Sequence, residues 1–226
     1  MKKISIQSLV ITAALISIAI VIDVLGSAIP ILNLSMPFGG KFFGISIIPL
    51  AFVGILFGVK HGLIAGFIYA MYNFSADYIV YLDALRVTLE SWTGESWGID
   101  KIVLLIILDY LIPFTAIGLT GFFHKSHQTV IDMVYGLVFA VGVRLISATL
   151  SGVVLWSSSI SYAVSEVEAG NMDPNIATRI FSVFNENVFG YSLGYNALYL
   201  ITTLIISVLI MIPIYERVIK RLGTDQ

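Results

Sequence analysis

The chain has 226 residues, of which 58% are hydrophobic and 12% are charged, and its formal net charge is −2 at pH 7. Soluble domains carry about 25% charged residues, so this composition indicates an integral membrane protein. The length suits a single domain, residues 1–226, and the small negative charge excludes a basic surface for nucleic acid. The absence of cysteine excludes disulfides, thiolate metal sites and a cysteine nucleophile.

Six apolar segments predict an all-α fold, a bundle of six transmembrane helices. A spanning helix needs about 20 apolar residues, and the second segment is short for a full crossing and contains Pro49. Lys and Arg are concentrated in the short connections on one side of this arrangement, so the positive-inside rule predicts cytoplasmic N and C termini. The predicted spans lie near residues 8–29, 42–57, 62–82, 102–123, 130–157 and 191–215.

The third and fourth spans carry polar side chains at depths where lipid is expected. Asn73 lies one turn from Asp77 on the same face of the third span. Asp109 interrupts the apolar run of residues 104–114 of the fourth span. A charge at such a depth costs about 3 kcal/mol on insertion scales, so Asp109 should face protein, pair with a cation or meet a ligand. A structural ion pair between Asp109 and Arg144 of the fifth span is one of these alternatives.

The fifth and sixth spans contribute aromatic and small residues at the same depth. Arg144, Ala148, Gly152 and Trp156 recur every four residues and therefore share one helix face. The inner half of the spans is almost uniformly apolar, which predicts a cavity that opens to the outside. A carboxylate among aromatic rings suits a flat aromatic cation. The candidate ligand contacts are Asn73, Asp109, Gly152, Trp156, Tyr191, Tyr195 and Asn196.

Structural interpretations of the same residues remain open. Aromatic residues at span ends, such as Trp156 and Tyr191, are typical of the belt at the membrane interface. Glycines within spans are typical of close helix packing. Two long external connections, residues 83–101 and 158–190, contain Trp92, Trp97 and Tyr162 and are candidate lids over the cavity.

Four sequence motifs resemble those of the thiamine-specific S components of energy-coupling factor (ECF) transporters. They follow one another in the order found in that family, and together they extend over nearly the whole chain. The fifth span, with Arg144, Gly152 and Trp156, also resembles the family's fifth helix. The motifs are Leu34-Ser35-Met36-Pro37-Phe38-Gly39-Gly40, Gly58-Val59-Lys60-His61-Gly62-Leu63, Leu108-Asp109-Tyr110 with Pro113-Phe114, and Tyr191-Ser192-Leu193-Gly194-Tyr195-Asn196.

The resemblance implies a bacterial plasma-membrane protein that captures a vitamin outside the cell and is not an enzyme. It implies no cofactor and no metal. The implied partners are the vitamin, membrane lipid, a transmembrane coupling protein and two ATPase subunits. The family docks through Ala-x-x-x-Ala on the first helix, which corresponds here to Ala13 and Ser17. Small residues at this spacing permit close approach of another helix.

The resemblance also implies roles for individual residues. Asp109 would engage the thiamine cation or its aminopyrimidine ring, Tyr191 and Asn196 would hydrogen-bond to the ligand or stack on it, and Trp156 and Gly152 would line the pocket. Some family members have a histidine where this chain has Ala148. A thiamine precursor or another vitamin is therefore an alternative ligand.

Two other functional classes are alternatives to vitamin capture. Asp77 and Asp109 could form the acid pair of an intramembrane enzyme, although neither lies in a recognisable catalytic motif. A self-sufficient secondary transporter is the other class, although the chain shows no repeated halves.

Overall fold

The computed structural model describes residues 5–42, 44–78, 81–123 and 129–222. These residues form helices and no β-strand, apart from one isolated bridge between Ser35 and Lys41. Four segments are long and apolar enough to cross a membrane. An all-helical integral membrane protein is therefore confirmed. The four segments are Ile6–Ala28, Ile99–Phe123, Val130–Val154 and Val188–Arg217.

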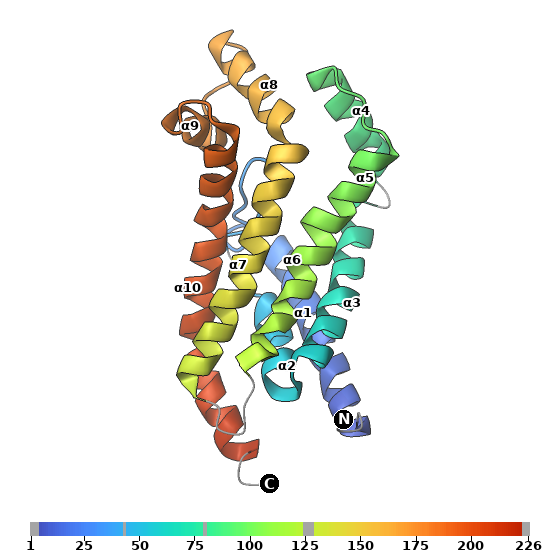
Figure 1. The fold of residues 1–226 in the computed structure, drawn as a ribbon, viewed down its shortest axis with the longest axis vertical. Coiled ribbons are helices and arrows are strands. Elements are labelled where there is room, and N and C mark those ends of the chain that lie inside the picture. Colours follow the sequence, from blue (N-terminus) through green and yellow to red (C-terminus); the bar gives the residue numbers. More distant parts are fainter. Residues whose placement is uncertain (1–4, 43, 79–80, 124–128, 223–226) are drawn as a thin grey trace.

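The helices run up and down between the two ends of an elongated bundle (Figure 1). The start of α1 and the end of α10 lie at the same end, opposite α4, α8 and α9 (Figure 1). The elements are α1 (Ile6–Ala28), α2 (Ile47–Phe57), α3 (Val59–Tyr78), α4 (Leu82–Thr93), α5 (Ile99–Leu105), the π-helical η1 (Ile106–Leu111), α6 (Ile112–Thr115), the 3-10 helix η2 (Ala116–Phe123), α7 (Val130–Val154), α8 (Ser157–Glu168), α9 (Ile176–Val183) and α10 (Val188–Leu222).

Helices α2 and α3 correspond to the predicted second and third spans, but neither is among the four segments that could cross a membrane. With 11 residues, α2 is only about 16 Å long and does not cross a bilayer alone. Residues 29–42 and 44–46, between α1 and α2, are not helical. The count of six spans and the cytoplasmic placement of the termini remain predictions.

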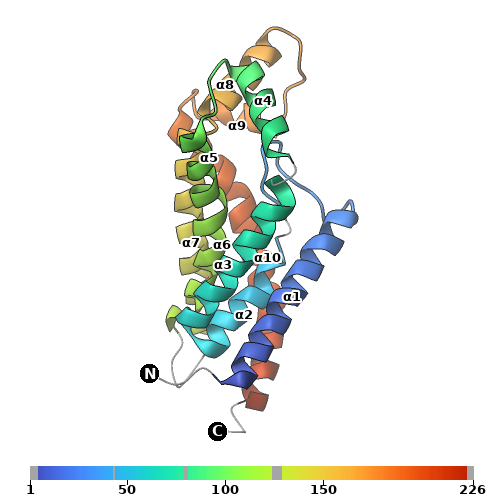
Figure 2. The same cartoon turned by 90° about the vertical axis from the view of Figure 1, so that its right-hand side faces the viewer.

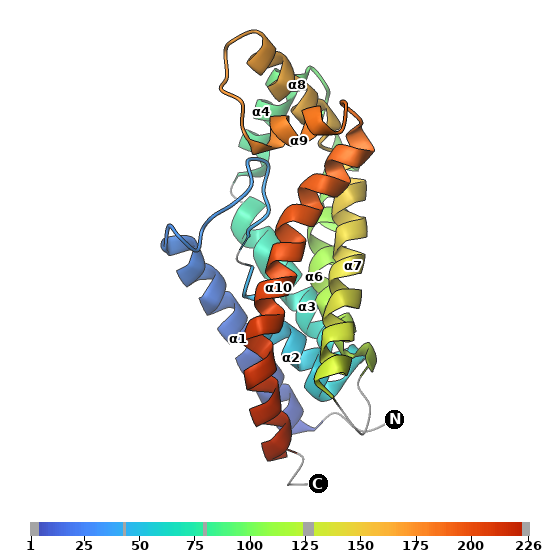
Figure 3. The same ribbon diagram turned by 90° about the vertical axis from the view of Figure 1, so that its left-hand side faces the viewer.

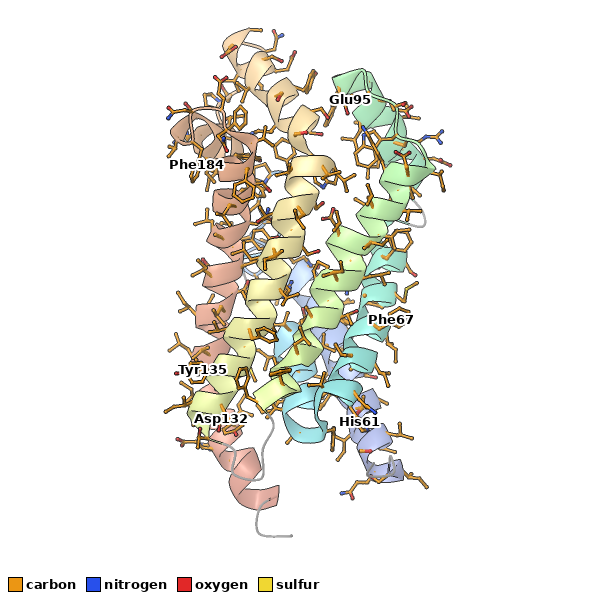
Figure 4. The ribbon with its side chains drawn as sticks, viewed as in Figure 1. His61, Phe67, Glu95, Asp132, Tyr135 and Phe184 are labelled. Carbon is orange, nitrogen blue, oxygen red and sulfur yellow. The ribbon has the colours of Figure 1, made fainter. Side chains whose placement is uncertain are left out.

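The sides of the bundle are apolar, as expected for a surface in contact with lipid. Phe67 on α3 and Tyr135 on α7 point away from the bundle (Figure 4). Glu95 and Phe184 lie toward one end, and His61 and Asp132 lie toward the other (Figure 4). Charged and polar residues therefore concentrate at the ends, where headgroups and water can solvate them.

Helix α1 is the least embedded of the long helices. It lies against the bundle near its start and diverges toward its C-terminal end (Figures 2 and 3). Only one narrow stripe of α1 is buried, whereas apolar residues such as Leu9, Val21 and Leu25 are exposed. The buried stripe consists of Ser8, Thr12, Ile16 and Ala19.

The end of the bundle opposite α8 is packed closely around glycines. Gly118 of η2 lies directly against the backbone of Gly62 and Leu63 on α3. Thr120 Oγ1 donates a hydrogen bond of 2.9 Å to the carbonyl oxygen of Ala51 on α2. Because three backbones meet there without intervening side chains, the inner half of the bundle is a dense apolar core.

Replacing Gly118 with alanine should destabilise the protein, because the added Cβ would collide with the backbone of Gly62 and Leu63. We expect a loss of about 1–3 kcal/mol, seen as a lower midpoint of thermal unfolding in detergent. Gly142→Ala on α7 is the matched control, because a Cβ there meets no atom within 4 Å. Equal midpoints for the two variants would contradict this description of the core.

Candidate ligand-binding site

A cavity of about 290 Å³ lies among α3, α6, α7, α10 and the segment of residues 38–46. This volume is near the lower end of the range for small-molecule sites. Every residue predicted to contact a ligand lines the cavity, although the residues come from four separate spans. These are Asn73, Asp109, Gly152, Trp156, Tyr191, Tyr195 and Asn196. Their role in binding remains a prediction. The side chain of Asp77 lies outside the described residues.

Asp109 reaches the cavity from a π-helical turn. The Ile112 N–H bonds to the Ile107 carbonyl, five residues back, instead of the Leu108 carbonyl. Pro113 has no N–H, so the Leu108 carbonyl also lacks a donor five residues ahead. The Ser147 hydroxyl on α7 donates to that carbonyl at 2.7 Å. The π-turn is thus satisfied by a neighbouring helix, as such turns often are at functional sites.

The carboxylate of Asp109 is held by the indole of Trp156. Trp156 Nε1 donates to Asp109 Oδ2 at 3.1 Å. Trp156 follows the last turn of α7 and is the N-cap of α8, so its ring lies where α7 bends into the cap formed by α4, α8 and α9. A tryptophan of the interfacial belt would present its N–H to headgroups. Here the N–H points into the protein, so Trp156 belongs to the cavity.

The predicted ion pair between Asp109 and Arg144 is wrong. Within the described residues, the ion pairs are Lys41 with Asp23 and Lys101 with Glu95. Arg144 lines the cavity, and its guanidinium carbon lies 5.6 Å from the centre of the Phe114 ring. Phe114 follows Asp109 by five residues, roughly 6–8 Å along a helix. The two charges are therefore at different depths, and Trp156 takes the place expected for Arg144.

Both buried asparagines bond to helix backbone. Asn196 Nδ2 donates to the Ser192 carbonyl at 2.8 Å and to the Ala148 carbonyl at 3.2 Å, and Asn196 Oδ1 accepts from Tyr199 at 2.9 Å. Asn73 Nδ2 donates to the Tyr69 carbonyl at 3.0 Å. Asn196 therefore fixes α10 against α7 while it lines the cavity.

Gly152 permits the closest contact between α7 and α10. A Cβ at this position would overlap the side chain of Ser192, whose hydroxyl donates to the Thr149 carbonyl at 2.9 Å. The resemblance implied that Gly152 lines the pocket. Although Gly152 does line the cavity, the space beside its Cα is filled by Ser192.

The segment of residues 35–44 forms a wall of the cavity that the sequence did not predict. Tyr195 accepts from the Phe38 N–H at 2.8 Å and donates to the Gly39 carbonyl at 3.2 Å. Two turns further along α10, Thr203 Oγ1 donates to the Lys41 carbonyl at 3.2 Å. The signals for this wall were the glycine pair of residues 39–40 and the shortness of the second apolar segment.

The same segment is also tied to α1. Lys41 Nζ lies 3.0 Å from Asp23 Oδ1 and donates to Ser27 Oγ at 2.9 Å. Asp23 and Lys41 both line the cavity. We call residues 35–42 and 44 the tethered loop, because α10 holds one side of it and α1 holds the other.

The external connections that were predicted as candidate lids contain helices α4, α8 and α9. Trp92 on α4 stacks on Tyr162 of α8, with ring centres 5.8 Å apart and planes 8° from parallel. Trp97 is buried, and its ring centre lies 5.6 Å from that of Trp156. Trp92 and Tyr162 thus hold α4 against α8 within the cap, and Trp97 joins the cap to the cavity residue Trp156. A lid motion remains a prediction.

An ion pair bridges the segment between α4 and α5. Lys101 Nζ lies 2.7 Å from Glu95 Oε2, and this hydrogen bond and the charge of Lys101 hold the pKa of Glu95 below its ordinary value. The Lys101 ammonium also lies 5.6 Å from the ring centre of Trp97. Glu95 is therefore ionised at neutral pH, and its ion pair with Lys101 fixes the segment that carries Trp97.

Tyr191 lies where the cavity meets the cap. Its ring is buried and packs edge-on against Phe181 of α9, with centres 5.4 Å apart. Tyr195 is the next ring on the same face of α10, at 5.5 Å. The interfacial-belt interpretation of Tyr191 does not hold, because the ring is enclosed by protein.

The predicted docking residues Ala13 and Ser17 are exposed on α1. They lie outside the buried stripe of that helix, so ordinary packing within the bundle does not account for them. The Ser17 hydroxyl donates to the Ala13 carbonyl at 3.0 Å, which satisfies it without a partner chain. The surface formed by Ala13 and Ser17 is available to another helix.

The part of the chain that the structure describes has no group of three or more His, Cys, Asp or Glu side chains that could hold a metal ion. The cavity instead combines aromatic rings, neutral hydrogen-bonding groups, one carboxylate near Trp156 and one guanidinium near Phe114. Such a lining can bind a small polar aromatic molecule without covalent chemistry.

Comparisons with known proteins point to one family. The family model described as "Thiamine transporter protein (Thia_YuaJ)" matches residues 88–168. These residues include the C-terminal half of α4 as well as Asp109, Arg144 and Trp156. Thiamine transporter ThiT of Bacillus subtilis (strain 168) is 24% identical over 215 residues, which cover 95% of this chain and 93% of that protein. The match to ThiT extends through the cavity-lining residues of α3 and α10, so the chain is similar to a thiamine transporter over nearly its whole length. This similarity, together with the apolar helices, identifies a multi-pass protein of the bacterial plasma membrane.

Proposed function

We propose that the protein is the substrate-binding S component of an ECF-type vitamin transporter and that it captures thiamine from outside the cell. In this role it binds the vitamin without covalent chemistry and is not an enzyme. A transmembrane coupling protein and two ATPase subunits supply the energy for delivery. The family match and the name of the Bacillus subtilis relative support thiamine as the cargo.

One observation carries the proposal: the carboxylate of Asp109 lies among aromatic rings in a cavity within the membrane bundle. Thiamine combines a positively charged thiazolium ring with an aminopyrimidine ring. A carboxylate attracts this cation, and the faces of Trp and Tyr rings stabilise it further. The cation in turn offsets the cost of a charge at this depth.

The dense core below the cavity supports the proposal that ligand delivery depends on partner proteins. Gly62, Gly118 and Thr120 bring α2, α3 and η2 together below the cavity. Ligand release toward the cytoplasm therefore requires movement of the whole bundle or its reorganisation by a partner. The exposed Ala13 and Ser17 provide a surface on which such a partner can pack.

Asp109→Asn should lower the affinity for thiamine at least about 30-fold, because the variant removes the charge facing a desolvated cation. The asparagine keeps the shape and can still accept from Trp156, so the unfolding midpoint should stay close to that of the wild type. Titration of vitamin-free protein with thiamine, followed by quenching of tryptophan fluorescence, measures the effect.

Asp173→Asn is the matched control, because Asp173 is exposed between α8 and α9. Unchanged affinity in Asp109→Asn would remove Asp109 from the site. If wild-type protein ignores thiamine but responds to its pyrimidine half, its thiazole half or another vitamin, the S-component role stands with a different ligand. Ala148, which also lines the cavity, is then the first position to examine.

Ala13→Phe should abolish thiamine uptake by cells that carry the coupling module, yet leave thiamine binding by the purified protein unchanged. The bulky ring prevents close helix approach at an exposed site remote from the cavity. Ile18→Phe, also exposed on α1 but on another face, is the control. Uptake by the protein alone in sealed vesicles with an ion gradient would instead favour a self-sufficient transporter.

A further inference from the structure

Arg144 is a cation without an anionic partner inside the bundle. Its Nε and Nη1 atoms are shielded from solvent and have no hydrogen-bond partner in the described part of the protein. Neither of the two ion pairs found there includes Arg144. The neighbouring Phe114 ring provides a cation–π contact at 5.6 Å. Such a contact offsets only part of the cost of burying an unpaired charge.

The backbone of α7 directs Arg144 toward the cavity. Arg144, Ala148, Gly152 and Trp156 are four residues apart from one another, and all four line the cavity. Helical side chains lean toward the N-terminus of their helix, which carries the guanidinium away from Trp156 and toward Phe114. The cation therefore lies at the deeper end of the cavity, and the carboxylate of Asp109 lies nearer the cap.

The fold keeps these opposite charges apart. Trp156 holds the carboxylate of Asp109 at 3.1 Å, and Asp23, another acidic residue of the cavity lining, is paired with Lys41 at 3.0 Å. Tyr69 and Tyr199 also line the cavity, but their hydroxyls are neutral and cannot balance the charge of the guanidinium. A molecule with a positive ring and a negative tail could satisfy both charges.

We propose that Arg144 forms an anion subsite and that the cavity accepts thiamine-like cations with a phosphomonoester or carboxylate at the end remote from the pyrimidine ring. A guanidinium presents paired N–H donors that match either group. The proposal rests on the proposed function for the position of the ring near Asp109 and Trp156. It adds a second determinant of specificity, which acts on the other end of the ligand.

The test compares thiamine with thiamine monophosphate in titrations of purified, vitamin-free protein. Wild-type protein should bind thiamine monophosphate at least as tightly as thiamine. Arg144→Met should weaken binding of the monophosphate about 10- to 100-fold, since a charge-assisted hydrogen bond is lost, and should change thiamine affinity far less. Arg144→Lys keeps the charge but loses the paired donors, so its affinity for the monophosphate should be intermediate.

Arg179→Met is the matched control, because Arg179 is exposed on α9 and should leave both affinities unchanged. Binding of thiamine with rejection of the monophosphate by wild-type protein would overturn the anion subsite and leave the proposed function intact. Equal weakening of both ligands in Arg144→Met and Arg144→Lys would also overturn it.

Two further outcomes separate the subsite from its alternatives. Millimolar inorganic phosphate should weaken binding of the monophosphate by wild-type protein but not by Arg144→Met. Equal sensitivity of the two proteins to phosphate would overturn the subsite. Binding of a carboxylate is measured with the thiamine analogue in which the hydroxyethyl group is oxidised to a carboxymethyl group. Arg144→Met should weaken binding of this analogue as much as it weakens binding of the monophosphate. Failure of wild-type protein to bind any of these ligands would reject thiamine as the cargo and the subsite with it.

Discussion

A carboxylate within a membrane span is stable only where protein groups replace water around it, and the outer half of this bundle is arranged around that constraint. The indole of Trp156 bonds to Asp109, and the π-turn that carries Asp109 depends on Ser147 of the neighbouring helix. Pro113 makes the irregular turn tolerable, because it removes a donor that a regular helix would use. Sequence, local backbone and packing thus act together at a single residue.

The bundle has two halves with opposite properties. The half near α8 is irregular, polar inside and capped by short helices, whereas the other half is a dense core in which glycine backbones touch. Irregular backbone is tolerated at membrane depth where it borders a cavity or is buried in protein. The π-turn and the tethered loop both satisfy that condition. The dense core fixes the positions of the four spans that carry the cavity residues relative to one another.

Much of the site could be predicted from the sequence, because side-chain depth and helical period are readable there. Asn73, Asp109, Trp156 and Asn196 all line the cavity. Most helices lie close to the predicted spans, but α2 begins at Ile47 rather than near residue 42, and α10 continues to Leu222 rather than ending near residue 215. The role of the loop before α2 was not predictable, since a short segment without helix has no period. The ion pair between Asp109 and Arg144 was wrong because sequence spacing fixes depth only to about one turn. A tryptophan N–H could therefore take the cation's place.

The tethered loop connects the ligand cavity to α1, so binding events at the two places can be coupled. Tyr195 and Thr203 hold it to α10, and Lys41 holds it to Asp23 on α1, the helix whose exposed face carries Ala13 and Ser17. A molecule that orders the loop from the cavity side also restrains α1. Coupling free energies are reciprocal. If the ligand changes the affinity of α1 for another protein by some factor, binding of that protein changes the affinity of the cavity for the ligand by the same factor.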